Sequence, residues 1–376
     1  MIPITKPYFS AEDAKAVSNT VLSGWVTQGP RVKEFEEKFA AYIGSKYAVA
    51  VSSCTTALHL ALIVCGIKAG DEVICPSLSF IATANVIRYV GAKPVFADVD
   101  RSTYNLDPQS AENVISKKTK AILLVHQLGM PADIDAFKSL SKKFNLKLIE
   151  DAACAIGSIY HGKKIGSHSD LVCFSFHPRK VITTGDGGMI TTSNRDHYQR
   201  LKLLRQHGMS TDDRTRHEAK KIIFEKYVEL GYNYRMTDIQ ASLGITQLKK
   251  LDYILKKRRE IAEKYNQVFK KIPYLEIPTE KKGNLTNYQS YTILLKKNSP
   301  VSQKKMMNAL LNRGIATRRG VMLIHQEPAY KNLYPKVKLP VSDYVSNNSI
   351  VLPLYVQMTN VETEKVIKKV CRAFYL

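Results

Sequence analysis

A lysine between a serine and a glycine-rich turn is the first group in this sequence that could do chemistry. Lys180 follows the apolar run 172–176, which contains Ser175, and it precedes the turn 183–188. A lysine that follows a strand is usually a solvated charge. Here a hydroxyl stands on one side of it, and on the other side glycines let the backbone approach a ligand closely. The amine of such a lysine can form a Schiff base with a carbonyl compound.

A carboxylate occupies a comparable position earlier in the chain. Residues 146–149 form a continuous apolar run, and Glu150 and Asp151 follow it directly. In open parallel sheets, ligands bind beyond the carboxyl ends of the strands, which makes Asp151 a second candidate. Taken alone, an acidic residue at such a place is more often part of a turn or a helix cap.

Small hydroxyl residues open a predicted helix after the apolar run 47–51. Ser52, Ser53, Thr55 and Thr56 surround its start. The N-terminus of a helix presents free amide groups and the positive end of the helix dipole, and both favour a phosphate group. The same residues would serve equally well as an ordinary helix cap.

Together, these three positions match the needs of one cofactor, pyridoxal 5'-phosphate. A lysine amine can hold the carbonyl carbon of this cofactor as a Schiff base. A carboxylate can keep the pyridine nitrogen protonated, which makes the ring an electron sink. Hydroxyls and amides at a helix start can bind the phosphate. The combination therefore predicts a pyridoxal-phosphate enzyme.

Short apolar runs alternate with helical patterns over the first 200 residues, and these elements must position the candidate groups. We expect strands at 47–51, 72–74, 94–97, 121–126, 146–149, 172–176 and 189–192. We expect helices at 55–65, 80–90 and 134–144, and a further helix that opens at Asp107-Pro108. This alternation is typical of βαβ units with a mostly parallel sheet, and continuous apolar runs suit strands buried on both faces. The predicted fold class is α/β.

A smaller α+β unit is expected towards the C-terminus. Thr237 and Gln240 form a capping box that opens a long helical stretch running towards Lys271. Beyond it we expect strands at 291–295, 315–317 and 350–352, and helices at 301–312 and 361–371. We therefore predict a large domain over residues 1–250 and a small C-terminal domain over residues 251–376.

Composition and charge argue against several classes of protein. No apolar run reaches the roughly 18–20 residues that span a bilayer, and the N-terminus lacks a signal-peptide pattern, so we expect a cytoplasmic protein with no membrane partner. The six cysteines form no CxxC pair, which argues against a metal site or a disulfide framework. A net charge of +23 favours anionic partners, such as a phosphorylated substrate. Because the sequence has no nucleic-acid motif, we expect no nucleic-acid partner.

Five segments, in order along nearly the whole chain, resemble the DegT/DnrJ/EryC1/StrS family of pyridoxal-phosphate enzymes, best known as nucleotide-sugar aminotransferases. Each segment is modest alone, and their common order makes the signal strong. The resemblance implies fold type I of the pyridoxal-phosphate transferases, which is similar to aspartate aminotransferase. The segments are Ser23-Gly24-Trp25-Val26-Thr27-Gln28-Gly29-Pro30, Glu150-Asp151-Ala152-Ala153, Phe174-Ser175-Phe176-His177-Pro178, residues 183–188 and Gly231-Tyr232-Asn233-Tyr234-Arg235-Met236.

The resemblance also implies roles for single residues. Lys180 would be the Schiff-base lysine, and Asp151 would pair with the pyridine nitrogen. Phe80 would stack on the cofactor ring, although core packing at a helix start would explain it too. Arg235 and His325 are weaker candidates on the substrate side, and Arg235 could equally be a structural ion-pair partner. The phosphate would be held by Thr55, Thr56 and Ser175.

The resemblance further implies a homodimer with shared active sites, because Asn233 would reach the phosphate in the neighbouring subunit. The expected activity moves an amino group from L-glutamate to a keto-sugar, with pyridoxamine phosphate formed between the two half-reactions. The acceptor would be a nucleotide-linked keto-deoxysugar, made for a surface polysaccharide or an antibiotic. Departures from the family pattern leave the sugar undetermined, and they fall at Leu128, Asp186, residues 288–289 and residues 318–322.

Three alternatives stay open at this point. The acceptor could be a keto-cyclitol or another non-nucleotide ketone. The protein could instead be a dehydratase-type relative. Such relatives carry histidine in place of the lysine, so Lys180 argues against this alternative. A non-catalytic sensory or regulatory member would fit the positive charge, but Lys180, Asp151 and Ser175 are all present.

Overall fold

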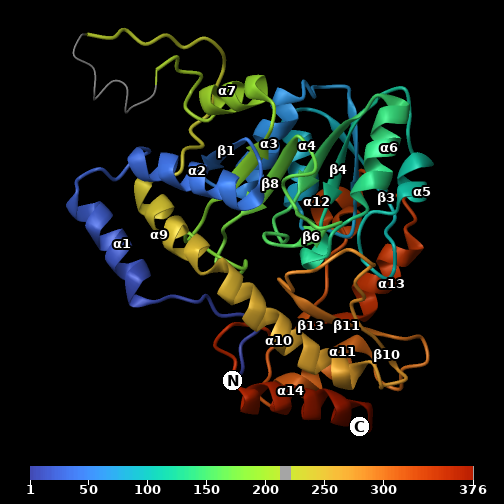
Figure 1. The fold of residues 1–376 in the computed structure, drawn as a ribbon. Coiled ribbons are helices and arrows are strands. Elements are labelled where there is room, and N and C mark those ends of the chain that lie inside the picture. Colours follow the sequence, from blue (N-terminus) through green and yellow to red (C-terminus); the bar gives the residue numbers. More distant parts are fainter. Residues whose placement is uncertain (212–221, 376) are drawn as a thin grey trace.

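A seven-stranded sheet forms the centre of the larger part of the molecule (Figure 1). The computed structural model describes residues 1–211 and 222–375. The strands lie in the order β1-β9-β8-β5-β4-β2-β3, and within this sheet β9 alone runs antiparallel to its neighbours. They are β1 (Tyr47–Val51), β2 (Glu72–Pro76), β3 (Lys93–Ala97), β4 (Thr119–Val125), β5 (Lys147–Asp151), β8 (Leu171–Ser175) and β9 (Gly188–Thr192).

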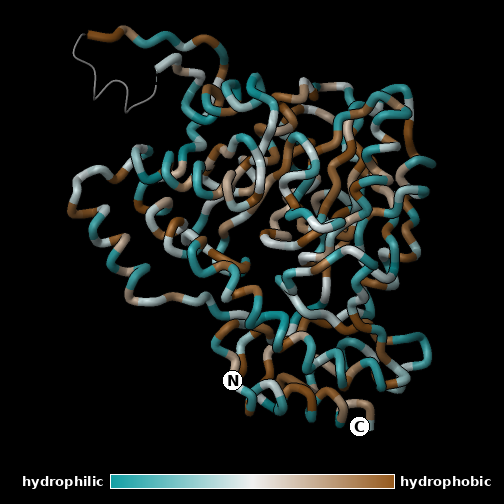
Figure 2. Tube along the Cα trace, in the orientation of Figure 1, coloured by the Kyte–Doolittle hydropathy of each residue, from teal (hydrophilic) through white to brown (hydrophobic). Residues whose placement is uncertain are grey.

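Helices cover both faces of this sheet, as the continuous apolar runs predict. In β1, Val49 and Val51 pack into one core with α3, whereas Ala48 and Ala50 pack into another with α2. Alternate residues of a strand point to opposite faces, so each face needs its own helices. Figure 2 shows apolar segments gathered inside the larger part of the molecule, with more polar segments around them. The helices are α1 (Ala11–Leu22), α2 (Pro30–Ile43), α3 (Cys54–Val64), α4 (Ala82–Tyr89), α5 (Pro108–Glu112), α6 (Ile134–Phe144) and α7 (Arg195–Leu204).

A smaller unit is built around a four-stranded antiparallel sheet in the order β10-β11-β13-β12. The N-terminal segment joins it, because Ile2 forms a bridge with Ile315 and the Leu354 amide donates to the Ile4 carbonyl at 3.0 Å. Both chain ends therefore lie on this unit, beside α14 (Figure 1). Its elements are β10 (Leu275–Glu276), β11 (Tyr291–Leu295), α11 (Gln303–Leu311), β12 (Arg318–Arg319), α12 (Pro328–Lys331), α13 (Pro340–Asn348), β13 (Ser349–Leu352) and α14 (Asn360–Arg372).

The helical stretch expected from Thr237 is divided into two helices at Lys250. They are α9 (Asp238–Lys249), which opens with the predicted capping box of Thr237 and Gln240, and α10 (Leu251–Phe269). The α10 helix is shared by the two units. Leu251 and Leu255 belong to a core of the large sheet, whereas Tyr265 belongs to the core of the small unit.

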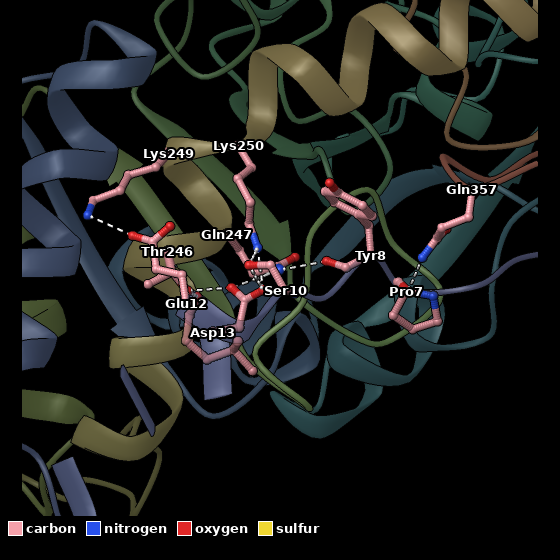
Figure 3. A network of polar contacts seen from close by, with 11 residues as sticks. Pro7, Tyr8, Ser10, Glu12, Asp13, Thr246, Gln247, Lys249, Lys250 and Gln357 are labelled. Carbon is pink, nitrogen blue, oxygen red and sulfur yellow. Dashed lines mark hydrogen bonds and ion pairs between the residues drawn. The ribbon is translucent and has the colours of Figure 1, made fainter. Parts of the chain in front are cut away.

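A buried aspartate lies beside the junction of the two helices at Lys250. Asp13 in α1 accepts hydrogen bonds from Lys250 and from Thr246, the latter at 2.5 Å, and Gln247 donates to it at 3.3 Å (Figure 3). Burial alone would raise the pKa of Asp13, but these hydrogen bonds, led by that from Lys250, hold it below its ordinary value. The α1 helix is thereby fixed to the junction between α9 and α10.

The predicted order of elements is confirmed, with differences at some ends. The strand expected at 315–317 instead forms at Arg318–Arg319, because Ile315 pairs with Ile2 and leaves the sheet edge to the next residues. A small hairpin of β6 (Ile159–Tyr160) and β7 (Lys163–Lys164) was not expected. In the part of the chain that the structure describes, no helix is long and apolar enough to cross a membrane.

Candidate active site

The ends of three neighbouring strands bring the candidate phosphate-binding groups together. Gly188 pairs with Val51 on one side and with Ser175 on the other. A Cβ atom on Gly188 would lie 2.4 Å from the carbonyl carbon of Ser53. Glycine is therefore needed here, since it lets the start of α3 approach the end of β8 at Ser175.

The start of α3 places its two threonines in different settings. Ser53 caps the helix, accepting the Thr56 amide at 3.2 Å, and the Thr56 hydroxyl donates to the Ser53 carbonyl at 2.7 Å. The Thr56 hydroxyl is thus used by the cap. The Thr55 hydroxyl makes no hydrogen bond to the described residues, which leaves it, with the amides of the first turn, to face a ligand.

Asp151 is a buried carboxylate at the end of β5. It is 7% exposed, and its two oxygens accept the Ala153 amide at 3.1 Å and the Thr83 hydroxyl at 3.3 Å. Burial raises the pKa of Asp151, although the Ala153 amide and the charge of Lys180 oppose the shift. A carboxylate in this setting gains from a cationic partner such as a protonated ring nitrogen.

The Lys180 amine lies 3.2 Å from the sulfur of Cys154. Burial alone would lower the pKa of Lys180, but Cys154, Asp151 and Cys54 outweigh it and raise that pKa. The structure therefore brings Lys180 and Asp151 into one electrostatic environment, as their positions after neighbouring strands predict. Cys154 was missed by the sequence analysis, although its place three residues after Asp151 in the same loop was a usable signal.

The ring of Phe80 lies on the surface, so core packing does not explain this residue. It is 68% exposed, and it precedes α4 by two residues. One turn further on, Thr83 contacts the Asp151 carboxylate. Phe80 therefore belongs to the segment that adjoins Asp151, and an exposed aromatic face there is available to a planar ligand.

The segment that contains Asn233 lies against the start of α3. The Ser52 amide donates to the Tyr234 carbonyl at 2.9 Å. Asn233 itself is exposed, and it forms a bridge with Gln206. Arg235 is half-buried.

His325 lies apart from the exposed surface, buried at the contact between the two units. It is 6% exposed, and its Nδ1 atom lies 2.7 Å from the Ser77 hydroxyl, which also accepts the His325 amide at 3.1 Å. Burial lowers the pKa of His325. These contacts fix the loop that leads from β2 to Phe80, and the substrate-side role of His325 stays a prediction.

A fully buried pair adjoins Asp151 on its other side. The Nδ1 atom of His126 accepts the Ala132 amide at 3.0 Å, so its Nε2 atom carries the proton and donates to Glu150 at 2.9 Å. Burial would raise the pKa of Glu150, but His126 lowers it. Glu150 is thereby held as a carboxylate, and it anchors the strand end that presents Asp151.

Comparison with known proteins assigns the family. The profile of the DegT/DnrJ/EryC1/StrS aminotransferase family matches residues 7–371. The chain belongs to this family. It is 40% identical over 372 residues to an uncharacterised protein of Methanocaldococcus jannaschii, with 98% of this chain and 96% of that protein covered.

Solved structures of aminotransferases share the whole fold. Helicobacter pylori PseC, described as an aminotransferase involved in the biosynthesis of pseudoaminic acid, has a TM-score of 0.93 at 31% identity, over 100% of this chain and 99% of that one. A putative sugar aminotransferase of Streptococcus pneumoniae, in its PMP form, has a TM-score of 0.93 at 28% identity, with the same coverage. The fold is that of the type I pyridoxal-phosphate enzymes, as the family resemblance implies.

The DegT/DnrJ/EryC1/StrS family depends on pyridoxal phosphate, and the residues of this chain fit that group. The close approach at Gly188 gathers Ser175 and the amides of α3 into a place for the phosphate. The buried Asp151 carboxylate suits a protonated ring nitrogen, and the exposed Phe80 ring suits a flat partner. Lys180 would supply the amine.

Proposed function

We propose that this protein is a pyridoxal-phosphate aminotransferase that moves an amino group from L-glutamate to a keto-sugar, specifically a nucleotide-linked keto-deoxysugar. The observation that carries the proposal is the convergence of Lys180, Asp151 and the start of α3 at one edge of the sheet. The cytoplasmic location expected from the sequence belongs to this proposal. The free state of all six cysteines supports a reducing compartment.

Each group has a distinct task in this proposal. When bound, pyridoxal phosphate supplies a carbonyl carbon for an amine and a ring that accepts electrons. The Lys180 amine would hold that carbonyl carbon. Once displaced by the donor, its neutral form would accept the proton from the donor's α-carbon. The Asp151 carboxylate would stay charged and orient the ring. Ser175 and Thr55 would hold the phosphate, and the same role for Thr56 stays a prediction because its hydroxyl already donates to the Ser53 carbonyl.

A sugar acceptor is supported by the structural relatives. The Streptococcus pneumoniae protein is described as a putative sugar aminotransferase, and PseC acts in pseudoaminic acid biosynthesis. The net charge of +23 adds support for an anionic acceptor such as a nucleotide sugar, because a positive field raises the local concentration of anions.

A homodimer is supported by an exposed apolar segment before Asn233. The exposed fractions are 86% for Ile222, 87% for Phe224 and 83% for Leu230. Exposed apolar side chains gathered in one segment commonly mark a protein interface. A second copy of the chain that covers this segment would lie close to the adjacent Asn233. The Asn233 of one copy would then reach the cofactor site of the other copy.

The absorbance spectrum of the purified, reconstituted protein tests the proposed function. The wild type should show a visible band of the lysine-bound cofactor, and L-glutamate should convert it to a near-ultraviolet band. Lys180→Ala should lack the visible band and lose about 100-fold or more in turnover. Lys142→Ala, which changes an exposed lysine of α6, should match the wild type. Wild-type turnover in Lys180→Ala or Lys180→Arg would refute the assignment.

A further inference from the structure

A polar cavity lies at the outer edge of β1, where α2 and α7 both pack against this strand (Figure 1). None of the residues proposed above for the cofactor or the substrate lines it. Its volume is about 150 Å³. Sites for drug-sized ligands measure roughly 300–1,000 Å³, so this volume suits a small ion rather than a nucleotide.

Arg205, the residue that ends α7, brings a buried hydrogen-bond donor to this cavity. It is 3% exposed, its Nη1 atom donates to the Ala50 carbonyl at 2.7 Å, and the same atom pairs with Glu36. Its Nε atom is also buried, and it has no hydrogen-bond partner among the described residues. A buried donor without a partner costs free energy, so an acceptor in the cavity would be stabilising.

Gln28 brings a buried acceptor to the same cavity. The Nε2 atom of Gln206 donates to the Met209 carbonyl at 3.3 Å, so the Oε1 atom of Gln206 is the one that accepts Gln28 Nε2, at 3.2 Å. The other side-chain atom of Gln28 is therefore an oxygen. It is buried, and within the described parts of the chain it has no hydrogen-bond partner.

Two lysines give the cavity an excess of positive charge. Lys46 and Lys202 line it, and neither forms an ion pair with any residue that the structure describes. The other charged side chains of the lining form two pairs of opposite charge, Arg205 with Glu36 and Lys33 with Glu37. The lining therefore favours an anion.

The backbone of β1 adds a further donor. The Ala50 amide donates to Glu36 at 2.8 Å, on the side of the strand that faces away from β9. Because the direction of the amide alternates along a strand, the Ala48 amide points to the same side. Ala48 lines the cavity.

We propose that this cavity binds a small oxyanion that carries a hydroxyl group, of the class of hydrogen phosphate. The Arg205 Nε atom, the Ala48 amide and the two lysines would donate to its oxygens, because charged donors form strong hydrogen bonds with oxyanions. The hydroxyl of the ion would donate to Gln28 Oε1. Sulfate has the same shape but no hydroxyl at neutral pH, so it would leave this acceptor without a partner. The site is separate from the proposed reaction and does not depend on it.

The test measures the binding of inorganic phosphate to the holoenzyme by phosphorus nuclear magnetic resonance, in a buffer free of phosphate. The bound cofactor keeps its own phosphate place occupied, so added phosphate reports on other sites. The wild type should bind phosphate, and sulfate as a competitor should bind about tenfold more weakly, because one buried acceptor stays unmet.

A double variant locates the site. Lys46→Gln combined with Lys202→Gln should weaken phosphate binding by about tenfold or more, since both charged donors are lost. Lys46 is exposed and Lys202 is half-buried, so the variant should fold, and its circular dichroism should match the wild type. The matched control combines Lys138→Gln with Lys142→Gln, which removes the same charge from the exposed face of α6, and it should stay within about twofold of the wild type.

Three results would overturn the inference. The first is a wild type that binds no phosphate, which would mean that the cavity holds water alone. The second is equal affinity in the site variant and in the wild type, or an equal loss in the control. The third is sulfate that binds as tightly as phosphate, because the unmet Gln28 oxygen would then play no part in recognition.

Discussion

The contact between Lys180 and Cys154 sets the environment of the candidate catalytic amine. Burial disfavours the charged amine, and the sulfur 3.2 Å away favours it. The positions of Lys180, Asp151 and Ser175 could be predicted because each lies at the end of a continuous apolar run or shortly after it. The contact of Cys154 with Lys180 could not, because it depends on side-chain rotamers.

Replacing Cys154 with alanine should lower the pKa of Lys180. Because a larger fraction of the amine is then neutral near pH 7, the apoprotein should take up pyridoxal phosphate faster, and the pH profile of uptake should move to lower pH. Stopped-flow absorbance at several pH values measures the profile. Cys371→Ala, in α14, is the matched control and should leave it unchanged. A shift to higher pH would contradict this account.

At the scale of elements, the break between α9 and α10 could not be predicted from local sequence patterns. The helical pattern continues through Lys250, and nothing nearby in the sequence marks an interruption. The partner that fixes this junction to α1 is Asp13, which lies 237 residues earlier and bonds to the Lys250 amine. The strands of the large sheet were easier to predict, because burial on both faces leaves a continuous apolar run in the sequence itself.

Asp13→Asn should reduce the free energy of unfolding, and the loss should depend on pH. The pKa of Asp13 is lowered in the folded protein, so its contribution is present above the ordinary aspartate pKa of about 3.9 and disappears as the pH falls through the folded value. Urea denaturation of wild type and variant should therefore differ most near neutral pH and least in acid. Glu12→Gln, which alters the exposed ion pair with Lys249, is the control and should change little. A difference that grows towards acid would show that Asp13 is not held as a carboxylate.

At the scale of the whole molecule, the large unit and the small unit are joined by α10, which contributes to the cores of both. Ile254 packs with the large sheet, and Phe269 packs with the small unit. The exposed apolar residues of the 222–230 segment, in contrast, have no cover within the described chain. The domain limits of 1–250 and 251–376 stay a proposal that limited proteolysis can test.

Phe224→Ser should weaken self-association of the protein. Removing one buried phenylalanine from an interface costs about 1.5–3 kcal/mol, so the dissociation constant should rise by about tenfold or more for each copy that loses it. Sedimentation velocity over a range of concentrations measures the change. Val361→Ser alters a residue of α14 that is 76% exposed and should leave the dimer intact. Equal association of both variants and the wild type would place the interface elsewhere.

The position of the two chain ends has a practical consequence. Both lie on the small unit beside α14 (Figure 1), whereas Lys180 and the start of α3 belong to the large sheet. A protein fused to either end, or a surface linker attached there, would be held on the side of the small unit. Immobilised enzyme prepared through these ends should therefore present the large sheet, with Lys180 and the start of α3, away from the support.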